Sequence, residues 1–414
     1  MKKNHLSSFI FLLIISFISN LFAINLDDNR LNPFDDIEDF EGVIYVKIGS
    51  SICTGALINH RTILTAAHCL IEGEKAEIYI GKVIDNDSSA IITTSFVKLP
   101  EEKRYATFNG ASYDVALISL KDPLLEITPI KLNPLLPNIN DEVYVSGYGL
   151  HGTGSSPDQD FDKKKRWGKN TISIIADESA LNGTSISSSS DKKIIGLNFD
   201  EDLDQLESMI SLGDSGSPLL VKREGEYSIV GVASWIKKNA SKLNRGYGAS
   251  AGFSSVQQNQ DWLEENNPLR VVTSIFDGKW SLDSNWDDPV FPSNQYPSLE
   301  NYNTASAKYY SVNIVNAINL NESIQIDSLK ISEYGHLSLQ NNSSLEVLID
   351  IHTERGNVDN EGTLTGGNLF LHKGSFVNKN EVLISKNIHV DDASIVNTGT
   401  ISAKKIELDQ GTVM

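Results

Sequence analysis

The chain has 414 residues and a formal net charge of −19, with 54 Asp and Glu against 35 Lys and Arg. This length exceeds that of one ordinary compact core, so two or three structural units are expected. The excess of negative charge argues against nucleic acid as a partner and against attraction to an anionic membrane surface.

The N-terminus has the three parts of an export signal. Two lysines precede an apolar run, residues 9–18, and Ala23 is a small residue at the expected cleavage point. A membrane anchor is the alternative, but the run is shorter than the roughly 20 residues that span a bilayer. We therefore expect residues 1–23 to be a signal peptide, Ile24 to begin the mature chain, and no integral membrane segment to remain.

The chain contains two cysteines, Cys53 and Cys69. In an exported protein they lie where disulfides persist, and two cysteines allow only one bridge. The bridge would close a loop around the segment that ends at His68. Two free buried thiols are the alternative.

Residues 24–42 are acidic and weakly patterned, which suggests an N-terminal arm or a propeptide. Short strands bounded by Gly, Asn, Asp or Pro are then expected at residues 43–48, 54–58, 63–66, 76–80, 91–97, 115–120 and 142–147. This pattern is typical of an antiparallel sandwich or barrel. A short helix is expected at residues 256–263, ahead of Pro268.

A polar loop is predicted between residues 152 and 169. Asp158, Asp160 and Asp162 alternate there as in a calcium-binding loop. However, Lys163 stands where that loop needs Gly, and Lys169 stands where it needs a carboxylate. The sequence therefore predicts a solvated acidic loop and no metal site.

From residue 269 the composition becomes rich in Asn, Ser, Ile and Leu, and a period appears. Segments 360–364, 378–382 and 397–401 recur 18 and 19 residues apart, each followed by two alternating aliphatic residues. Such repetition favours a stacked parallel β-solenoid over an irregular sandwich with chance recurrence. We assign residues 269–322 to a linker that leads into the solenoid and residues 323–414 to its repeats.

Three stretches carry groups suited to nucleophilic catalysis. Ser215 lies in Gly213-Asp214-Ser215-Gly216-Ser217-Pro218, His68 in Thr65-Ala66-Ala67-His68-Cys69, and Asp114 in Tyr113-Asp114-Val115-Ala116-Leu117. A serine hydroxyl is a poor nucleophile unless a base and a group that orients this base are present.

In order and spacing, these stretches resemble the signature blocks of the chymotrypsin/trypsin-like serine peptidases. Supporting similarities are Cys53 opposite Cys69 and the segments at 147–150, 230–235 and 261–263. The resemblance covers about residues 31–266. It implies a two-barrel peptidase domain at 24–268. Together with the short parallel β-helix or solenoid expected from the period, this gives an all-β chain.

The resemblance also implies roles for individual residues. Ser215 would be the nucleophile, His68 the general base, and Asp114 the carboxylate that orients the imidazole. The backbone N–H groups of Gly213 and Ser215 would form the oxyanion hole. No cofactor is implied, and the substrate would be a protein or peptide.

In the resembled family Asp214 pairs with a new N-terminus, released before an Ile-Val-Gly-Gly-like run. That run is absent here. Counting back from the first strand leads to Arg30, and cleavage after it would free the amine of Leu31. However, Pro33 and Phe34 would give the new N-terminal segment a different backbone path from that of the resembled family. Whether the protein is a zymogen stays open at this point.

The resemblance places Met209, Ser234, Trp235, Ile236 and Ala251 around the primary specificity pocket. Met209 stands where a trypsin has Asp, so a preference for Arg or Lys is not supported. A branched residue at Ile236 would make the pocket shallow. We expect cleavage after small or medium apolar residues.

We therefore predict a secreted serine endopeptidase. The alternatives are an adhesin that uses a peptidase-like scaffold and, less favoured, an esterase with the same triad. A peptidase joined to a solenoid resembles bacterial autotransporter passengers, but the chain has no room for their membrane barrel before Met414. We expect a bacterial protein that is periplasmic or released, or a shortened relative of that group, with an unknown solenoid partner.

Overall fold

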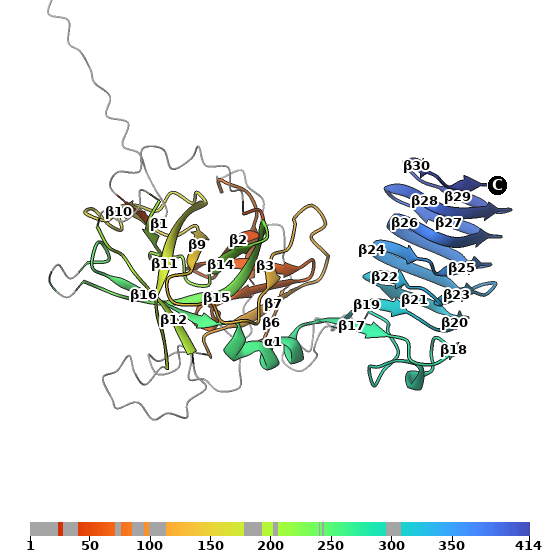
Figure 1. Ribbon diagram of the computed structural model, residues 1–414, viewed down its shortest axis with the longest axis horizontal. Helices are drawn as coiled ribbons and strands as arrows, with labels where there is room; N and C mark the ends of the chain where they lie inside the picture. The colour runs from red at the N-terminus through yellow and green to blue at the C-terminus, as the bar shows by residue number, and fades with distance from the viewer. Residues whose placement is uncertain are drawn as a thin grey trace, which may run out of the picture.

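The computed structural model describes residues 24–27, 40–70, 76–84, 95–98, 113–177, 193–201, 206–239, 241, 244–294 and 308–414. Within these residues the regular structure is almost entirely β-strand, in a peptidase-like part and a stacked parallel solenoid (Figure 1). This confirms the predicted all-β fold class. The predicted signal peptide and Arg30 lie outside the described residues.

The first sheet of the peptidase-like part is six-stranded and antiparallel, in the order β5-β2-β3-β4-β7-β6. Every residue of the short central strands β4 and β7 is buried. Their β-branched and aliphatic side chains fit a sheet that is covered on both faces. The bounds are β2 (Val43–Ile48), β3 (Ser51–Asn59), β4 (Thr62–Thr65), β5 (Ala76–Tyr79), β6 (Ser95–Lys98) and β7 (Ala116–Leu120).

The second sheet has seven strands in the order β14-β9-β11-β12-β16-β15-β8. Strand β14 also pairs with β15, so six of the strands close into a barrel. Closure leaves these six strands without a free edge. The bounds are β8 (Lys131–Leu132), β9 (Glu142–Gly147), β11 (Arg166–Asp177), β12 (Lys193–Asn198), β14 (Pro218–Arg223), β15 (Glu226–Lys237) and β16 (Ser250–Ser255).

The third sheet is small and contains the N-terminal segment. Strand β1 (Ile24–Leu26) lies between β10 (His151–Thr153), to which it is parallel, and β13 (Ser208–Met209), to which it is antiparallel. All three residues of β1 are buried. The expectation of a weakly patterned arm is therefore wrong for these residues, because Ile24 and Leu26 join the apolar core of the second sheet.

A short helical segment ends the peptidase-like part (Figure 1). It consists of a 3-10 turn, η5 (Gln257–Asn259), and the helix α1 (Gln260–Asn266). Pro268 disfavours helical backbone at the residue before it, and Asn267 is accordingly extended. In the described residues, no helix has the length and apolar character needed to cross a membrane.

The solenoid sheet starts directly after this helix with β17, earlier than the predicted first repeat at residue 323. Its ladder pairings are parallel, as a stack of coils requires. The bounds are β17 (Leu269–Thr273), β18 (Gly278–Lys279), η6 (Asp283–Asn285), β19 (Tyr309–Ile314), β20 (Ala317–Leu320), β21 (Ser323–Ile326), β22 (Ser328–Ile331), β23 (His336–Leu339), β24 (Ser344–Glu354), β25 (Asn357–Asn360), β26 (Thr363–Asn378), β27 (Glu381–Ile384), β28 (Asn387–Asn397), β29 (Thr400–Ser402), β30 (Lys405–Asp409) and β31 (Thr412–Val413).

The repeat of Asn and Gly in the sequence corresponds to a ladder of asparagines. Asn360 and Asn378 are fully buried and are register partners, and Asn378 is the register partner of Asn397. Asn360 Nδ2 donates to Asn378 Oδ1 at 2.8 Å, and Asn378 Nδ2 donates to Asn397 Oδ1 at 2.7 Å. The period is therefore structural, and the irregular sandwich is excluded.

Candidate active site

Strands β4 and β7 bring His68 and Asp114 together. The two strands pair antiparallel with Thr65 opposite Ala116, so the segment after β4 and the segment before β7 meet at the same end. The 3-10 turn η1 (Ala67–Cys69) carries His68. His68 Nδ1 lies 2.6 Å from Asp114 Oδ2, and the backbone N–H of His68 donates to Asp114 Oδ1 at 2.9 Å.

The Asp114 carboxylate is almost completely buried, with 2% of its side chain exposed. In addition to His68, Ser234 Oγ donates to Asp114 Oδ2 at 2.6 Å. The sequence places Ser234 only at the substrate pocket, so its bond to this carboxylate was missed. Three donors satisfy the buried charge and fix its orientation.

The imidazole of His68 is partly open to solvent, with 33% of its side chain exposed. Burial is the largest effect on its pKa and lowers it, but the hydrogen bond to Asp114 and the charge of Asp114 together outweigh burial. The net result is a pKa above the ordinary value of 6.5. Because the carboxylate accepts a hydrogen bond from Nδ1–H, the proton of the neutral ring stays on Nδ1 and Nε2 keeps its lone pair.

Ser215 lies in a turn with positive backbone φ on both sides, 95° at Gly213 and 84° at Gly216. A Cβ atom on Gly216 would lie 2.1 Å from Thr65 Oγ1, so a larger residue does not fit. The carbonyl of Ser215 accepts from the Thr54 N–H at 2.9 Å. The turn is thus packed against Thr65, three residues before His68.

The disulfide between Cys53 and Cys69 is present, with an S–S distance of 2.04 Å. It joins β3 to the residue directly after His68. Cys69 Sγ also lies 3.7 Å from the carbonyl oxygen of Ser215. The predicted bridge therefore lies beside two of the three candidate catalytic residues, and the alternative of free thiols is excluded.

Asp214 is fully buried next to Ser215. Its carboxylate accepts the N–H groups of Gly149 and Ser211, both at 2.8 Å. Burial is the largest effect and raises the pKa of Asp214 from 3.8 to about 7, although the two backbone bonds oppose it. A Cβ atom on Gly147 would lie 2.2 Å from Asp214 Oδ1, which explains why this position is Gly.

Strand β1 lies close to this carboxylate in the fold. Ile24 is the register partner of His151, two residues after Gly149, and Asn25 is the register partner of Met209, two residues before Ser211. Ile24 is fully buried and has a φ of 62°. The left-handed region is rare for a β-branched residue, so the backbone at Ile24 is strained.

The residues expected at the specificity pocket lie mainly on β15 and β16. Ile236 and Ala251 are register partners across these strands, and Ser234 connects the same strand to Asp114. Trp235 packs against Gly252, where a Cβ atom would lie 2.2 Å from its ring. Met209 is fully buried in the core of the second sheet.

The acidic loop is less solvated than predicted, because two of its carboxylates bind arginines. Asp162 accepts two 2.8 Å hydrogen bonds from the buried guanidinium of Arg166. Asp158 accepts one from Arg245 at 2.8 Å and also binds the Ser211 hydroxyl. Across the described residues, no group of three His, Cys, Asp or Glu side chains is placed to hold a metal ion.

Comparisons with known proteins agree with this geometry. Residues 36–263 match the family model described as Trypsin. A protein named serine protease SSP1 from Scolopendra subspinipes is 26% identical over 226 residues, which are 52% of this chain and 72% of that protein. Trypsin theta from Drosophila melanogaster is 28% identical over 111 residues, 26% of this chain and 41% of that protein.

Both relatives are animal proteins, and the bacterial origin suggested by the solenoid stays a prediction. The family match ends at residue 263, before the first solenoid strand. It nevertheless spans more than half of the chain and includes every residue of the candidate site other than the N-terminal strand. The chain therefore belongs to the trypsin family and is a serine-type endopeptidase.

Proposed function

We propose that the protein cleaves peptide bonds through an acyl-enzyme formed on Ser215. Ser215 Oγ attacks the scissile carbonyl carbon while His68 Nε2 takes the hydroxyl proton. His68 then gives this proton to the leaving amine, and a water molecule deacylates Ser215 by the same route. Asp114 stabilises the imidazolium and does not itself take the proton.

The observation that carries the proposal is the pairing of His68 with the buried Asp114, directly beside the packed turn of Ser215. Asp114 leaves Nε2 as the basic nitrogen, which is the atom that a nucleophilic serine requires. The N–H groups of Gly213 and Ser215 would bind the oxyanion. One such donor typically contributes about 3 kcal/mol to transition-state stabilisation.

The N-terminus that pairs with Asp214 is, in this proposal, the amine of Ile24. Removal of residues 1–23 would free this amine in a buried strand and would end the strained φ of 62°, since φ requires a preceding residue. Burial raises the pKa of Asp214 to about 7. A cationic amine beside it would offset the cost of burying the ionised carboxylate. Export would then activate the protein, and no later cleavage after Arg30 is needed.

The proposed substrates are proteins cut after small or medium apolar residues. Ile236 faces Ala251 across the β15–β16 pair, and its branched side chain would limit the depth of the pocket. Met209 supplies no carboxylate for Arg or Lys. Profiling with a peptide library tests this preference: a dominant cleavage after Arg would overturn it.

The decisive test of function is labelling with a fluorophosphonate probe. We expect protein that starts at Ile24 to be labelled and to cleave casein, and Ser215→Ala to do neither. Failure to label at Ser215 would favour the adhesin, and cleavage of esters but not casein would favour the esterase. Finding a chain that starts at Ile24 in the medium would support secretion.

A further inference from the structure

A fully buried ion pair joins the peptidase domain to the solenoid. Arg61 lies in the turn between β3 and β4, and Asp327 lies between β21 and β22. Arg61 Nε donates to Asp327 Oδ2 and Nη2 donates to Oδ1, both at 2.8 Å. Both side chains are 0% exposed.

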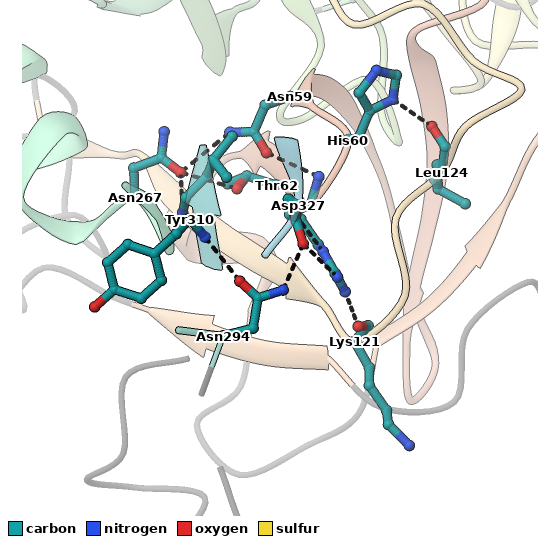
Figure 2. A network of polar contacts seen from close by, with 11 residues as sticks. Asn59, His60, Thr62, Lys121, Leu124, Asn267, Asn294, Tyr310 and Asp327 are labelled. Carbon is teal, nitrogen blue, oxygen red and sulfur yellow. Dashed lines mark hydrogen bonds and ion pairs between the residues drawn. The ribbon is translucent and has the colours of Figure 1, made fainter. Parts of the chain in front are cut away.

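Other groups complete the surroundings of this pair (Figure 2). The solenoid supplies the ring of Tyr309, whose centroid is 4.1 Å from the Arg61 guanidinium carbon. Asn294 Nδ2 donates to Asp327 Oδ1 at 2.8 Å. The peptidase domain supplies the carbonyl of Lys121, which accepts from Arg61 Nη1. The guanidinium therefore lies between the two parts of the chain, and each part contributes to its contacts.

A second contact fixes the same turn. Asn267, which follows α1, accepts through Oδ1 from Asn59 Nδ2 at 3.2 Å and from Thr62 Oγ1 at 3.0 Å (Figure 2). The N–H of Leu269, the first residue of the solenoid sheet, donates to the same oxygen at 3.1 Å. Residues on both sides of Arg61 are thus attached to the start of the solenoid.

Burial of this kind is unlike the polar, hydrated contact between domains that move independently. A buried guanidinium without its carboxylate is strongly unfavourable, so the turn and the solenoid must stay together once they have docked. The bidentate geometry also fixes the relative orientation of the two groups.

Arg61 lies at one end of the β4–β7 pair, and the catalytic side chains lie at the other. The carbonyl of Arg61 accepts from the Leu120 N–H at 2.7 Å, so its backbone and its side chain both bind the end of β7. Strand β4 has four residues and leads into the turn of His68. A shift of Arg61 would be transmitted along this short, fully buried strand pair.

We propose that Asp327 is a positioning residue for the His68–Asp114 pair, acting through Arg61. The solenoid is then an integral part of the peptidase and not a tethered module. This inference rests on the proposed serine endopeptidase activity.

The test compares full-length wild-type protein with Asp327→Asn, which keeps the shape and removes the charge. The active sites of each sample are first titrated with a fluorophosphonate, and kcat, KM and their pH dependence are then measured on a fluorogenic peptide. We expect kcat to fall about tenfold, KM to change less than twofold, and the acid limb of kcat/KM to shift. Glu361→Gln, which breaks the exposed ion pair with Lys379, is the matched control and should leave all three unchanged.

A double variant, Arg61→Met with Asp327→Leu, keeps the test informative if Asp327→Asn folds poorly. It removes both charges and fills the site with apolar side chains, and we expect it to fold and to recover most of the lost kcat. A lower Tm in Asp327→Asn with wild-type kcat and pH profile per titrated site would overturn the proposal. The proposal is also overturned if neither Asp327→Asn nor the double variant changes kcat. Wild-type protein that does not react with the fluorophosphonate would instead reject the proposed function.

Discussion

Ser234 Oγ and His68 Nδ1 share one acceptor, the Oδ2 atom of Asp114, and both lie 2.6 Å from it. One residue is next to the specificity pocket and the other is the candidate base. The strand proposed to contact substrate is therefore hydrogen-bonded directly to the carboxylate that is paired with the imidazole.

The first prediction concerns this shared acceptor. Ser234→Ala removes a hydrogen bond to a buried charge, which is worth about 1.5–3 kcal/mol. We expect kcat/KM to fall by roughly tenfold to a hundredfold. Ser234→Thr keeps the hydroxyl and should retain most of the activity. Equal kinetics in Ser234→Ala and wild type would contradict a role for this bond.

The second prediction concerns pH. His68 must be neutral to act as a base, and Asp114 raises its pKa above 6.5. In Asp114→Asn only burial remains, so the pKa of His68 should fall and the acid limb of kcat/KM should move to lower pH. The maximum kcat should drop about 10⁴-fold. An acid limb that does not move would show that another group controls it.

The third prediction concerns Asp214 and the N-terminus. In protein that retains residues before Ile24, Asp214 has no terminal amine as partner, and its raised pKa favours folding at low pH. The folded state then binds more protons than the unfolded state between pH 3.8 and about 7, so stability falls as pH rises through this window.

Protein that starts at Ile24 should lose much of this dependence, because the cationic amine stabilises ionised Asp214. Thermal unfolding of both forms from pH 4 to 8 measures the difference. Only the form that starts at Ile24 should react with a fluorophosphonate. Matching curves and matching reactivity would remove the role of Ile24.

The fourth prediction compares two glycines. Gly147→Ala places a methyl group against the carboxylate of Asp214, at an ideal distance of 2.2 Å from Oδ1. We expect a loss of about 1–3 kcal/mol in stability and a large loss of activity. Gly225→Ala meets no atom within 4 Å, and its φ of +87° should cost about 1 kcal/mol with normal activity per folded molecule. Chemical denaturation and active-site titration separate the two effects.

The fifth prediction concerns the asparagine ladder. Asn378→Ala removes the Oδ1 acceptor that Asn360 Nδ2 uses and the Nδ2 donor that binds Asn397 Oδ1, and we expect the loss of these hydrogen bonds to lower stability by about 1–3 kcal/mol. Asn380→Ala, at an exposed position of the same turn, should change stability by less than about 0.5 kcal/mol. Urea unfolding monitored by circular dichroism gives both values.

The sequence was sufficient where a local pattern determines the structure. Alternation and turn residues identified most strands of the first sheet, and β2 and β9 begin and end where they were expected. The Asn360, Asn378 and Asn397 repeat predicted the solenoid because identical turns stack directly on one another. The disulfide followed from there being only two cysteines in a chain that is predicted to be exported.

What the sequence missed depends on contacts between distant residues. Strand β1 has only three residues and no recognisable alternation of apolar and polar residues. It is nevertheless buried, because it pairs with β10 on one side and with β13 on the other. The bond from Ser234 to Asp114 joins positions 120 residues apart. Arg61 is a charged residue in a tight turn, where exposure is the ordinary expectation. Its burial required a partner from another domain.

Arg61 and Asp327 are 266 positions apart. A chain that emerges from a ribosome or a translocation channel N-terminus first therefore presents Arg61, His68, Asp114 and Ser215 well before the carboxylate that binds Arg61. During that interval the guanidinium is hydrated and the turn before β4 has no second domain against it. If Asp327 positions the catalytic strands through Arg61, as proposed, their final ordering waits until the coil that carries Asp327 has docked. A molecule still in transit would then be less able to cut its neighbours than one that has been fully released.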